Sequence, residues 1–310
     1  MKQIKKIDIH AHAVAFPEYY PPYLDSIEGQ PVRFLSCDEL FKFYDELNIE
    51  KGVLLPLVAP EGQCAPMSSE ACKYLADKYP DRLLWFCNVD PQAGKNRADT
   101  NLAHFINHYK RLGALGLGEL TSQLYADDPR MDNLFAHCAE CDMPVTIHIS
   151  AGYGNINDNG YGIIDEMGLP RIEKMLQKHK NLKIIGHSQL FWAEISGDLT
   201  EEERKGYPKG KVTEGTLTRL MRAYDNLYCD LSAGSGANAM MRDPEFAAEF
   251  MEEFADRILY GCDICHVYNT FQYDFDDFLV QLCESGALSE ENYRKIVREN
   301  AIRLLKLDVK

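Results

Sequence analysis

The segment Ile7-Asp8-Ile9-His10-Ala11-His12 decides how the rest of the chain can be interpreted. Its apolar and polar residues alternate, which is the period-two pattern of a β-strand. Residues two apart in a strand project to the same side, so we expect the rings of His10 and His12 to point together. Two imidazoles held in this way can bind one metal ion. An HxH pair alone is a weak motif, and its meaning depends on further ligands at the ends of later strands.

Short apolar segments recur along the chain and alternate with amphipathic segments. Strands are predicted at residues 7–10, 52–58, 83–89, 114–119, 144–148, 182–187, 227–231 and 258–263. Helices are predicted over residues 38–47, 68–79, 96–111, 129–141, 169–179, 213–224, 244–254, 271–284 and 290–305. This alternation is typical of a parallel sheet covered on both faces. Eight strand–helix units favour an α/β fold, a (β/α)8 TIM barrel forming a single domain over residues 1–310.

The bulk composition narrows the classes of molecule that the protein is expected to bind. The chain has 310 residues and a net charge of −15, which disfavours nucleic acid and anionic membranes. Its longest apolar runs, such as residues 52–58, are too short to span a bilayer, and no signal peptide is predicted. We therefore expect a cytoplasmic protein, with its ten cysteines reduced. The expected partner is a small-molecule substrate, and a homo-oligomer is left open.

Two cysteine pairs and one histidine pair have spacings that metal sites use. The cysteine pairs are Cys138/Cys141 and Cys262/Cys265, but their segments are over a hundred residues apart, so packing is the expected role. His104 and His108 are four residues apart without the glutamate of a zinc-protease motif, and we expect them on an outer helix.

Polar residues stand at the predicted C-terminal ends of five strands. They are His10 and His12, Glu119, His148, His187 and Asp263. In a barrel these ends converge at one mouth. Imidazoles and carboxylates suit zinc, manganese or iron, so the sequence predicts a divalent metal site, with zinc as the expected ion. The long connections 13–37 and 149–168 leave the same ends, and we expect them to cover a substrate.

On these segments the chain resembles the amidohydrolase superfamily, specifically the amidohydrolase-2 group that includes aminocarboxymuconate-semialdehyde decarboxylase. The matching pieces, which run over residues 8–305, are Asp8-Ile9-His10-Ala11-His12, His148, Gly186-His187, Gly261-Cys262-Asp263 and Glu299-Asn300-Ala301-Ile302-Arg303-Leu304-Leu305. The resemblance implies a metal ion held by His10, His12, His148 and Asp263. It implies that His187 is an acid/base residue beside the metal or a ligand of a second ion.

Glu119 departs from the pattern of many binuclear relatives, which carry a carboxylated lysine at the end of the fourth strand. A glutamate can bridge two ions, with His148 and His187 on the second, or it can accept a hydrogen bond from a ligand histidine. We expect one firmly bound metal with Glu119 near it, because two divalent ions would face only Glu119 and Asp263 as protein charge.

The expected activity is hydrolysis of an amide, lactone or related bond in a small molecule. A metal ion in such a site lowers the pKa of a bound water toward ~7. Asp263 is then both ligand and proton acceptor, and His187 polarises the carbonyl or protonates the leaving group. The alternative is a metal-dependent non-oxidative decarboxylase of an unsaturated or aromatic carboxylic acid. A third possibility is a catalytically silent barrel used for binding or assembly.

Candidate substrate contacts follow three of the strand ends. Ser232, Ser235 and Asn238 follow the seventh strand in a glycine-rich segment that we expect to be a turn. Gln189 and Trp192 follow His187, and His266 follows Asp263. Their position after a strand end is the only feature that makes Ser232, Ser235, Asn238, Gln189, Trp192 and His266 candidates.

Overall fold

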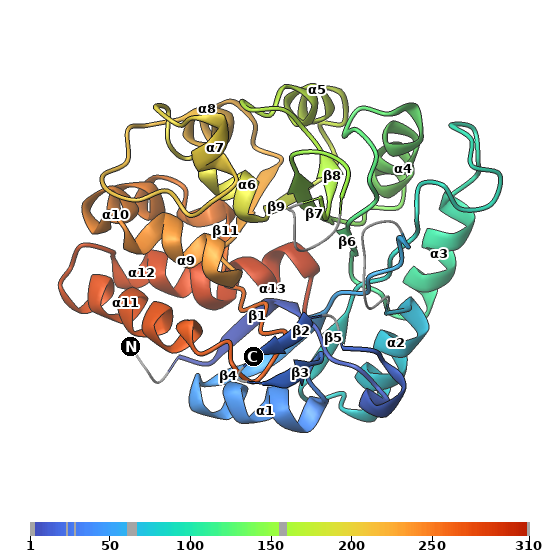
Figure 1. The fold of residues 1–310 in the computed structure, drawn as a ribbon, viewed down its shortest axis with the longest axis horizontal. Helices are drawn as coiled ribbons and strands as arrows, with labels where there is room; N and C mark the ends of the chain where they lie inside the picture. Colours follow the sequence, from blue (N-terminus) through green and yellow to red (C-terminus); the bar gives the residue numbers. More distant parts are fainter. Residues whose placement is uncertain (1–3, 23, 28, 61–66, 155–159, 309–310) are drawn as a thin grey trace.

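Eight parallel strands surrounded by helices form the body of the protein (Figure 1). The structure is a computed structural model that describes residues 4–22, 24–27, 29–60, 67–154 and 160–308. The barrel strands are β1 (Lys6–Ala11), β4 (Ile49–Leu54), β5 (Leu83–Trp85), β6 (Leu117–Leu120), β7 (Val145–Ser150), β9 (Ile184–His187), β10 (Leu227–Asp230) and β11 (Ile258–Leu259). They pair in the orders β1-β4-β5 and β6-β7-β9-β10-β11.

Backbone hydrogen bonds join the two sheets into a closed barrel. The N–H of Cys87 donates to the carbonyl of Gly116 at 3.0 Å, which connects the segment after β5 to the segment before β6. The N–H of Ile9 donates to the carbonyl of Tyr260 at 3.0 Å, which connects β1 to the end of β11. The predicted (β/α)8 barrel is therefore confirmed.

The helices of the outer layer mostly begin where the sequence carries start signals. Ser36 caps the first of them through a reciprocal bond with Glu39, and Asp128 and Asp243 each precede a proline at a helix start. The helices are α1 (Cys37–Glu46), α2 (Ser69–Lys78), α3 (Ala103–Arg111), α4 (Pro129–Glu140), α5 (Pro170–Lys178), α6 (Gln189–Ala193), α7 (Glu201–Arg204), α8 (Thr216–Ala223), α9 (Ala233–Met241), α10 (Pro244–Glu253), α11 (Phe271–Glu284), α12 (Glu290–Arg294) and α13 (Asn300–Leu305). A π-helical segment, Lys295–Glu299, joins the last two.

Several secondary-structure predictions differ from the structure, and the strands expected over residues 52–58, 83–89 and 258–263 end at Leu54, Trp85 and Leu259. The helix expected from residue 96 begins only at Ala103, and Asn96 itself has a left-handed φ of 52° that a helix does not allow. The glycine-rich segment after β10 is the helix α9 rather than a turn. Its glycines allow close packing: a Cβ on Gly236 would lie 2.2 Å from the carbonyl oxygen of Leu231.

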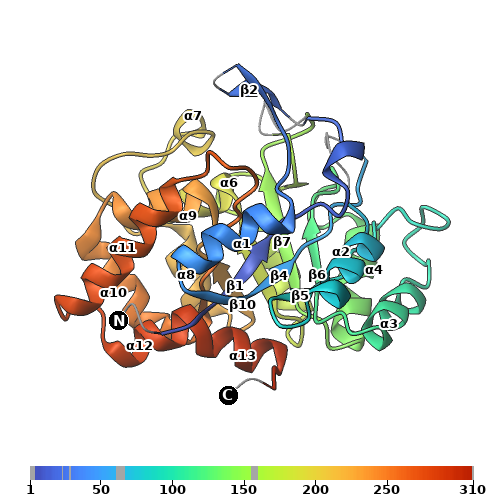
Figure 2. The same ribbon diagram turned by 90° about the horizontal axis from the view of Figure 1, so that it is seen from below.

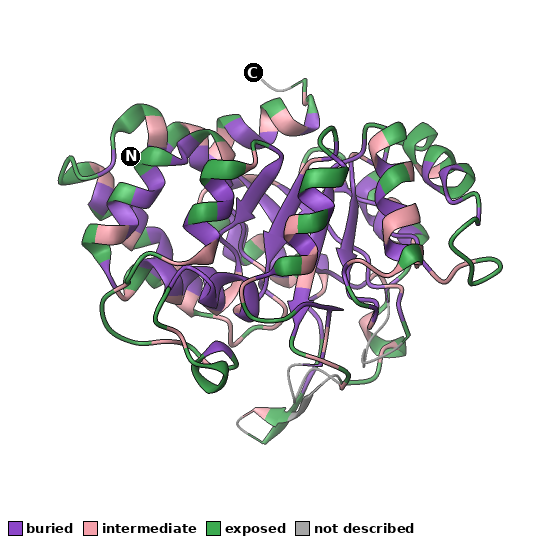
Figure 3. Cartoon of the chain, turned by 90° about the horizontal axis from the view of Figure 1, so that it is seen from above, coloured by how far each residue is buried: buried purple, intermediate pink, exposed green. Residues whose placement is uncertain are grey.

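The apolar core has an inner and an outer layer. The inner layer fills the barrel with Ile7, Val53, Phe86, Ile185 and Leu259, and α13 adds Ala301 and Leu305 to it. The outer layer lies between the strands and the helices, whose outward faces are the exposed ones (Figure 3). Burying one such aliphatic side chain stabilises the fold by about 1.5–3 kcal/mol. We call the end of the barrel next to α13 the floor and the opposite end the mouth.

The two long connections lie at the mouth. The first contains a hairpin of β2 (Leu24–Ile27) and β3 (Gln30–Val32), which projects at the opposite end of the barrel from α13 (Figure 2). The second contains the short strand β8 (Ile163–Ile164), which pairs with β7, while residues 155–159 lie outside the described part. Side chains of both connections pack together in one apolar cluster that includes Phe34 and Tyr161. Within the described residues, no helix has the length and apolarity needed to cross a membrane.

Candidate metal centre

His10 and His12 lie at the C-terminal end of β1, and both rings are almost fully buried. The register between β1 and β4 shifts between Asp8 and Ala11. Irregularities of this kind change the direction in which side chains project, and they recur beside active sites. The carbonyl of His10 also accepts the N–H of Asp263 at 2.8 Å, so the backbone itself ties β1 to the segment that follows β11.

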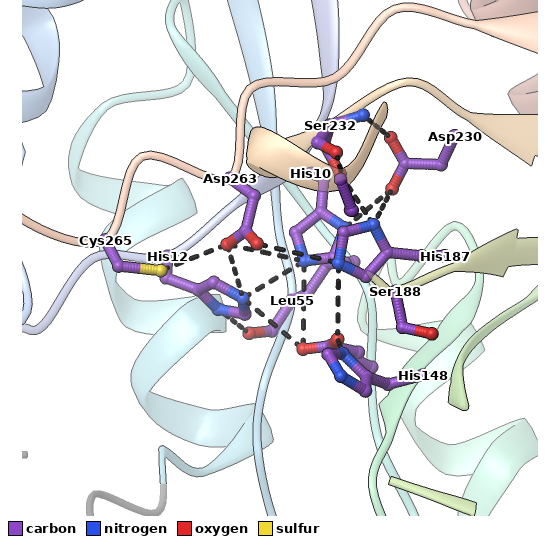
Figure 4. A network of polar contacts seen from close by, with 12 residues as sticks. His10, His12, Leu55, His148, His187, Ser188, Asp230, Ser232, Asp263 and Cys265 are labelled. Atoms are coloured by element: carbon purple, nitrogen blue, oxygen red, sulfur yellow. Dashed lines mark hydrogen bonds and ion pairs between the residues drawn. The ribbon is translucent and has the colours of Figure 1, made fainter. Parts of the chain in front are cut away.

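The ring partners of these two histidines define where their lone pairs point (Figure 4). Nδ1 of His10 lies 2.7 Å from Oδ2 of Asp230, and Nδ1 of His12 lies 3.0 Å from the carbonyl oxygen of Leu55. Because these oxygens accept hydrogen bonds, each Nδ1 carries a proton, and in the neutral form of each ring Nε2 presents its lone pair. The two Nε2 atoms are 3.1 Å apart. Lone pairs this close repel each other unless a cation lies between them, so the donor set fits a metal ion.

Glu119 and Asp263 complete a ring of four donor atoms. Oε2 of Glu119 lies 3.7 Å from Nε2 of His10 and 3.5 Å from Nε2 of His12. Oδ1 of Asp263 lies 3.8 Å and 3.5 Å from the same two nitrogens. Two donor atoms that each lie about 2.0–2.2 Å from the same ion are separated from each other by distances close to those given above. Each carboxylate therefore lies at ligand spacing from both rings.

The charges of the centre depend on one another. Burial disfavours a negative charge on Glu119, but His148, His10 and His12 lower its pKa well below the usual range. Burial acts in the same direction on Asp263, and His10 is the main group that lowers the pKa of its carboxyl. Burial disfavours a positive charge on His10, yet Asp263 and Asp230 raise its pKa well above the usual value. The two carboxylates thus attract a cation to the histidine rings.

His148 and His187 lie on the other side of Glu119. Nδ1 of His148 is 2.6 Å from Oε1 of Glu119, whereas Nε2 of His187 is 3.9 Å from that oxygen and 3.6 Å from Oδ2 of Asp263. Glu119 therefore belongs to two groups of candidate ligands, one with His10 and His12 and one with His148 and His187. Of the implied set, His10, His12 and Asp263 lie at ligand spacing from one another, whereas the carboxylate of Glu119 lies between His148 and the two rings of β1.

Three residues of the centre were missed from the sequence. Asp230 ends β10 with no exposed surface, and a search for carboxylates at strand ends would have found it. The hydroxyl of Tyr161 donates to Oε2 of Glu119 at 3.3 Å, from a loop that carries no periodic signal. Sγ of Cys265 lies 3.0 Å from Oδ1 of Asp263. Its CxxC partner, Cys262, is buried in the apolar core, so this pair does not form one site.

A cavity of about 180 Å³ opens above these residues. Ligand pockets are commonly about 300–1,000 Å³, so this space suits a small substrate. Its lining residues are His12, Phe34, Leu57, Glu119, His148, Ile149, Tyr161, His187, Ser188, Gln189, Leu190, Tyr207, Ala233, Ser235, Asp263 and Cys265. Lysine and arginine are absent from this described lining.

Two of the candidate substrate contacts, Gln189 and Ser235, line the cavity. Ser232 is fully buried, and its hydroxyl lies 2.9 Å from Nδ1 of His187. Trp192 belongs to the core, and its indole N–H donates to the carbonyl of Asp230 at 2.9 Å. The burial of Trp192 argues against a substrate contact.

The remaining candidates lie away from the cavity. Neither Asn238 nor His266 is among the lining residues: the amide of Asn238 donates to the carbonyl of Pro208, and Nδ1 of His266 accepts the N–H of Tyr268. His104 and His108 are exposed on α3. Cys138 and Cys141 are buried in the core, as expected for packing residues.

Comparison with known proteins places this geometry in a family. The chain matches the family model described as "Amidohydrolase" over residues 7–307. No curated protein sequence matches the chain.

Several solved structures share the fold over nearly the whole chain. The 2,6-dihydroxybenzoate decarboxylase from Rhizobium is 19% identical, with a TM-score of 0.62 and coverage of 98% of this chain and 99% of that one. A candidate 2-pyrone-4,6-dicarboxylic acid hydrolase from Pseudomonas putida is 15% identical, with a TM-score of 0.62 and coverage of 99% and 100%. The 5-carboxyvanillate decarboxylase from Novosphingobium aromaticivorans, complexed with manganese, is 16% identical, with a TM-score of 0.62 and coverage of 99% and 97%. At these identities the likeness shows the fold, whereas the family match spans almost every residue, and the chain belongs to the amidohydrolase family.

Proposed function

We propose that this protein is a metal-dependent hydrolase that cleaves an amide, lactone or related bond in a small uncharged molecule. The observation that carries the proposal is the pair of Nε2 atoms of His10 and His12, 3.1 Å apart and each 3.5–3.8 Å from two carboxylates, beside a small cavity. His10, His12, Glu119 and Asp263 would hold the ion. Imidazole with carboxylate suits zinc, with manganese or iron as alternatives.

When bound, a divalent ion supplies Lewis acidity, which lowers the pKa of water and polarises a carbonyl oxygen. The side chains around the ion accept and transfer protons. Oδ2 of Asp263 faces Nε2 of His187 at 3.6 Å, so a proton accepted by Asp263 has a nearby carrier to the leaving group. Tyr161, Gln189 and Ser235 present polar groups on the cavity wall, where they can orient the substrate.

The charge of the cavity favours a neutral substrate. Its described lining contains the carboxylates of Glu119 and Asp263 but no lysine or arginine. Residues 61–66 and 155–159, which lie outside the described part of the chain, also contain no lysine or arginine. An aromatic or unsaturated carboxylic acid would therefore have only the metal ion and the histidines as counter-charge. The arrangement supports hydrolysis of an uncharged bond better than decarboxylation of an acid.

A decarboxylase is the second candidate, because two of the similar structures are decarboxylases of aromatic acids. Heavy-oxygen water separates the reactions once a turned-over substrate is found in a panel of lactones, amides and aromatic acids. Hydrolysis places the label at the cleaved bond. Carbon dioxide release without incorporated label would overturn the hydrolase. Absence of bound metal after reconstitution with zinc, manganese or iron, measured by elemental analysis, would overturn both candidates and favour a silent barrel.

A further inference from the structure

Asp230 lies beneath the proposed metal centre and touches two of its histidines. Tyr228 points into the barrel core, and Asp230 lies two residues further along β10, so its side chain projects to the same side, nearer the mouth. Its Oδ2 atom lies 2.7 Å from Nδ1 of His10 and 3.5 Å from Nδ1 of His187. One carboxylate oxygen thus faces the inner nitrogen of both rings.

Ser232 extends this contact to His187. It occupies the position before α9, where a serine hydroxyl usually accepts a hydrogen bond from the first turn of the helix. No such bond is present here, and the hydroxyl lies instead 2.9 Å from Nδ1 of His187. The backbone N–H of Ser232 donates to Oδ1 of Asp230 at 3.0 Å. The serine therefore connects the carboxylate to the ring rather than capping the helix.

The backbone around Asp230 leaves space for this arrangement. A Cβ on Gly261 would lie 2.2 Å from Oδ1 of Asp230 and 2.8 Å from Cβ of Ser232. The indole N–H of Trp192 donates to the carbonyl of Asp230 at 2.9 Å, which holds the end of β10 in place. The carboxylate is thus confined to one position between the two rings.

We infer that Asp230 is a positioning residue that holds His10 and His187 in the same tautomer, with the proton on Nδ1 and the lone pair of Nε2 directed toward the mouth. For His10 this tautomer is the one that can coordinate a metal ion. For His187 it directs the Nε2 lone pair toward Oδ2 of Asp263, 3.6 Å away, where the ring can accept a proton that this carboxyl group carries. A single buried carboxylate thereby couples the metal ligand to the proton carrier. The inference rests on the proposed metal centre but not on the reaction that the centre catalyses.

The test combines zinc affinity with nitrogen NMR of the histidine rings in the zinc-loaded protein. In the parent, we expect Nδ1–H on both rings. Asp230→Asn should weaken zinc binding by about 10–100-fold, the usual effect of removing a carboxylate behind a ligand histidine, and should change the ring-nitrogen shifts of both His10 and His187. Ser232→Ala should change the shifts of His187 alone and leave zinc affinity as in the parent.

Asp243→Asn is the matched control, because this buried carboxylate accepts backbone N–H groups of Val212 and Phe246 and touches no histidine. If Asp230→Asn does not fold, Gly261→Ala displaces the carboxylate without removing its charge, and the same shifts are expected to move. Unchanged shifts in the variants that fold, or a loss of zinc affinity no larger than in Asp243→Asn, would overturn the inference. A parent that binds no zinc would instead overturn the metal centre itself.

Discussion

The side chains at the mouth and at the floor of the barrel are buried to the same degree, but those at the floor are apolar and those at the mouth are polar or charged. At the floor, side chains such as Leu259 and Leu305 are at most 4% exposed and are entirely apolar. At the mouth, His10 and Glu119 are at most 2% exposed and carry polar or charged groups. Burial stabilises the first set, whereas it penalises the second unless hydrogen bonds and a cation offset the cost. The comparison teaches that apolar burial at the floor stabilises the fold, whereas the buried polar groups at the mouth are the ones available for binding and chemistry.

The largest expected effect is loss of the metal ion when the mouth is altered. His10→Ala or Asp263→Ala removes one of the four converging donors, so metal affinity should fall by more than about 100-fold, beyond the effect of removing a partner behind a ligand. The barrel should remain folded, because neither residue contributes to the apolar clusters. Elemental analysis and circular dichroism measure the two quantities. Normal metal content in both variants would show that the ion is held elsewhere.

Replacing a buried apolar side chain at the floor should lower stability but leave the metal in place. Leu305→Ala or Leu259→Ala removes a buried side chain from the inner cluster, and we expect the free energy of unfolding to fall by about 2–5 kcal/mol. Chemical denaturation of the metal-free proteins gives this value, and elemental analysis gives the stoichiometry. A floor variant that loses its metal while still folded would contradict the separation between the two ends.

Glu119→Gln sharpens the description of the mouth, because Glu119 lies between the two pairs of histidines. We predict that the parent binds one equivalent of zinc or manganese tightly. In the variant the metal affinity should fall by about 10-fold or more, since a coordinating charge is lost while the shape of the side chain is kept. Calorimetric titration of both proteins measures this. Two tight equivalents in the parent, falling to one or none in the variant, would instead show that Glu119 bridges two ions.

The smallest effect concerns a buried carboxylate that faces no histidine. Burial raises the pKa of Asp165 to about 7, although the N–H groups of Glu166, Arg171 and Ile172 favour its charged form. The folded protein therefore keeps a proton that the unfolded chain loses above pH 3.8. This contribution to stability is complete below pH 3.8 and is lost as the pH rises to about 7.

Asp165→Asn should remove this pH dependence of the free energy of unfolding, because an amide has no proton to lose between pH 4 and pH 7. Denaturation midpoints of the parent and the variant between pH 4 and pH 7 measure it. Parallel curves for the two proteins would show that Asp165 is ionised throughout this range, like the carboxylates at the mouth.

The sequence by itself determined the barrel and most of the groups at its mouth. Period-two segments, helix start signals and the order of the eight strands are local properties, so they could be recognised without coordinates. The rule that catalytic residues follow barrel strands then selected His10, His12, Glu119, His148, His187 and Asp263. The same local rules misassigned α9, because the packing of Gly236 against Leu231 is not visible in composition.

Only the tertiary structure decided how these groups face one another. His10 and Asp230 are 220 residues apart, and their 2.7 Å contact exists because the barrel closes. The same closure places Glu119 between His148 and the rings of β1, and it buries Trp192 where the sequence predicted a substrate contact. Tautomers and lone-pair directions depend on such contacts. The physical reason is that hydrogen bonds and charge pairs act over a few ångströms, which distance along the chain does not specify.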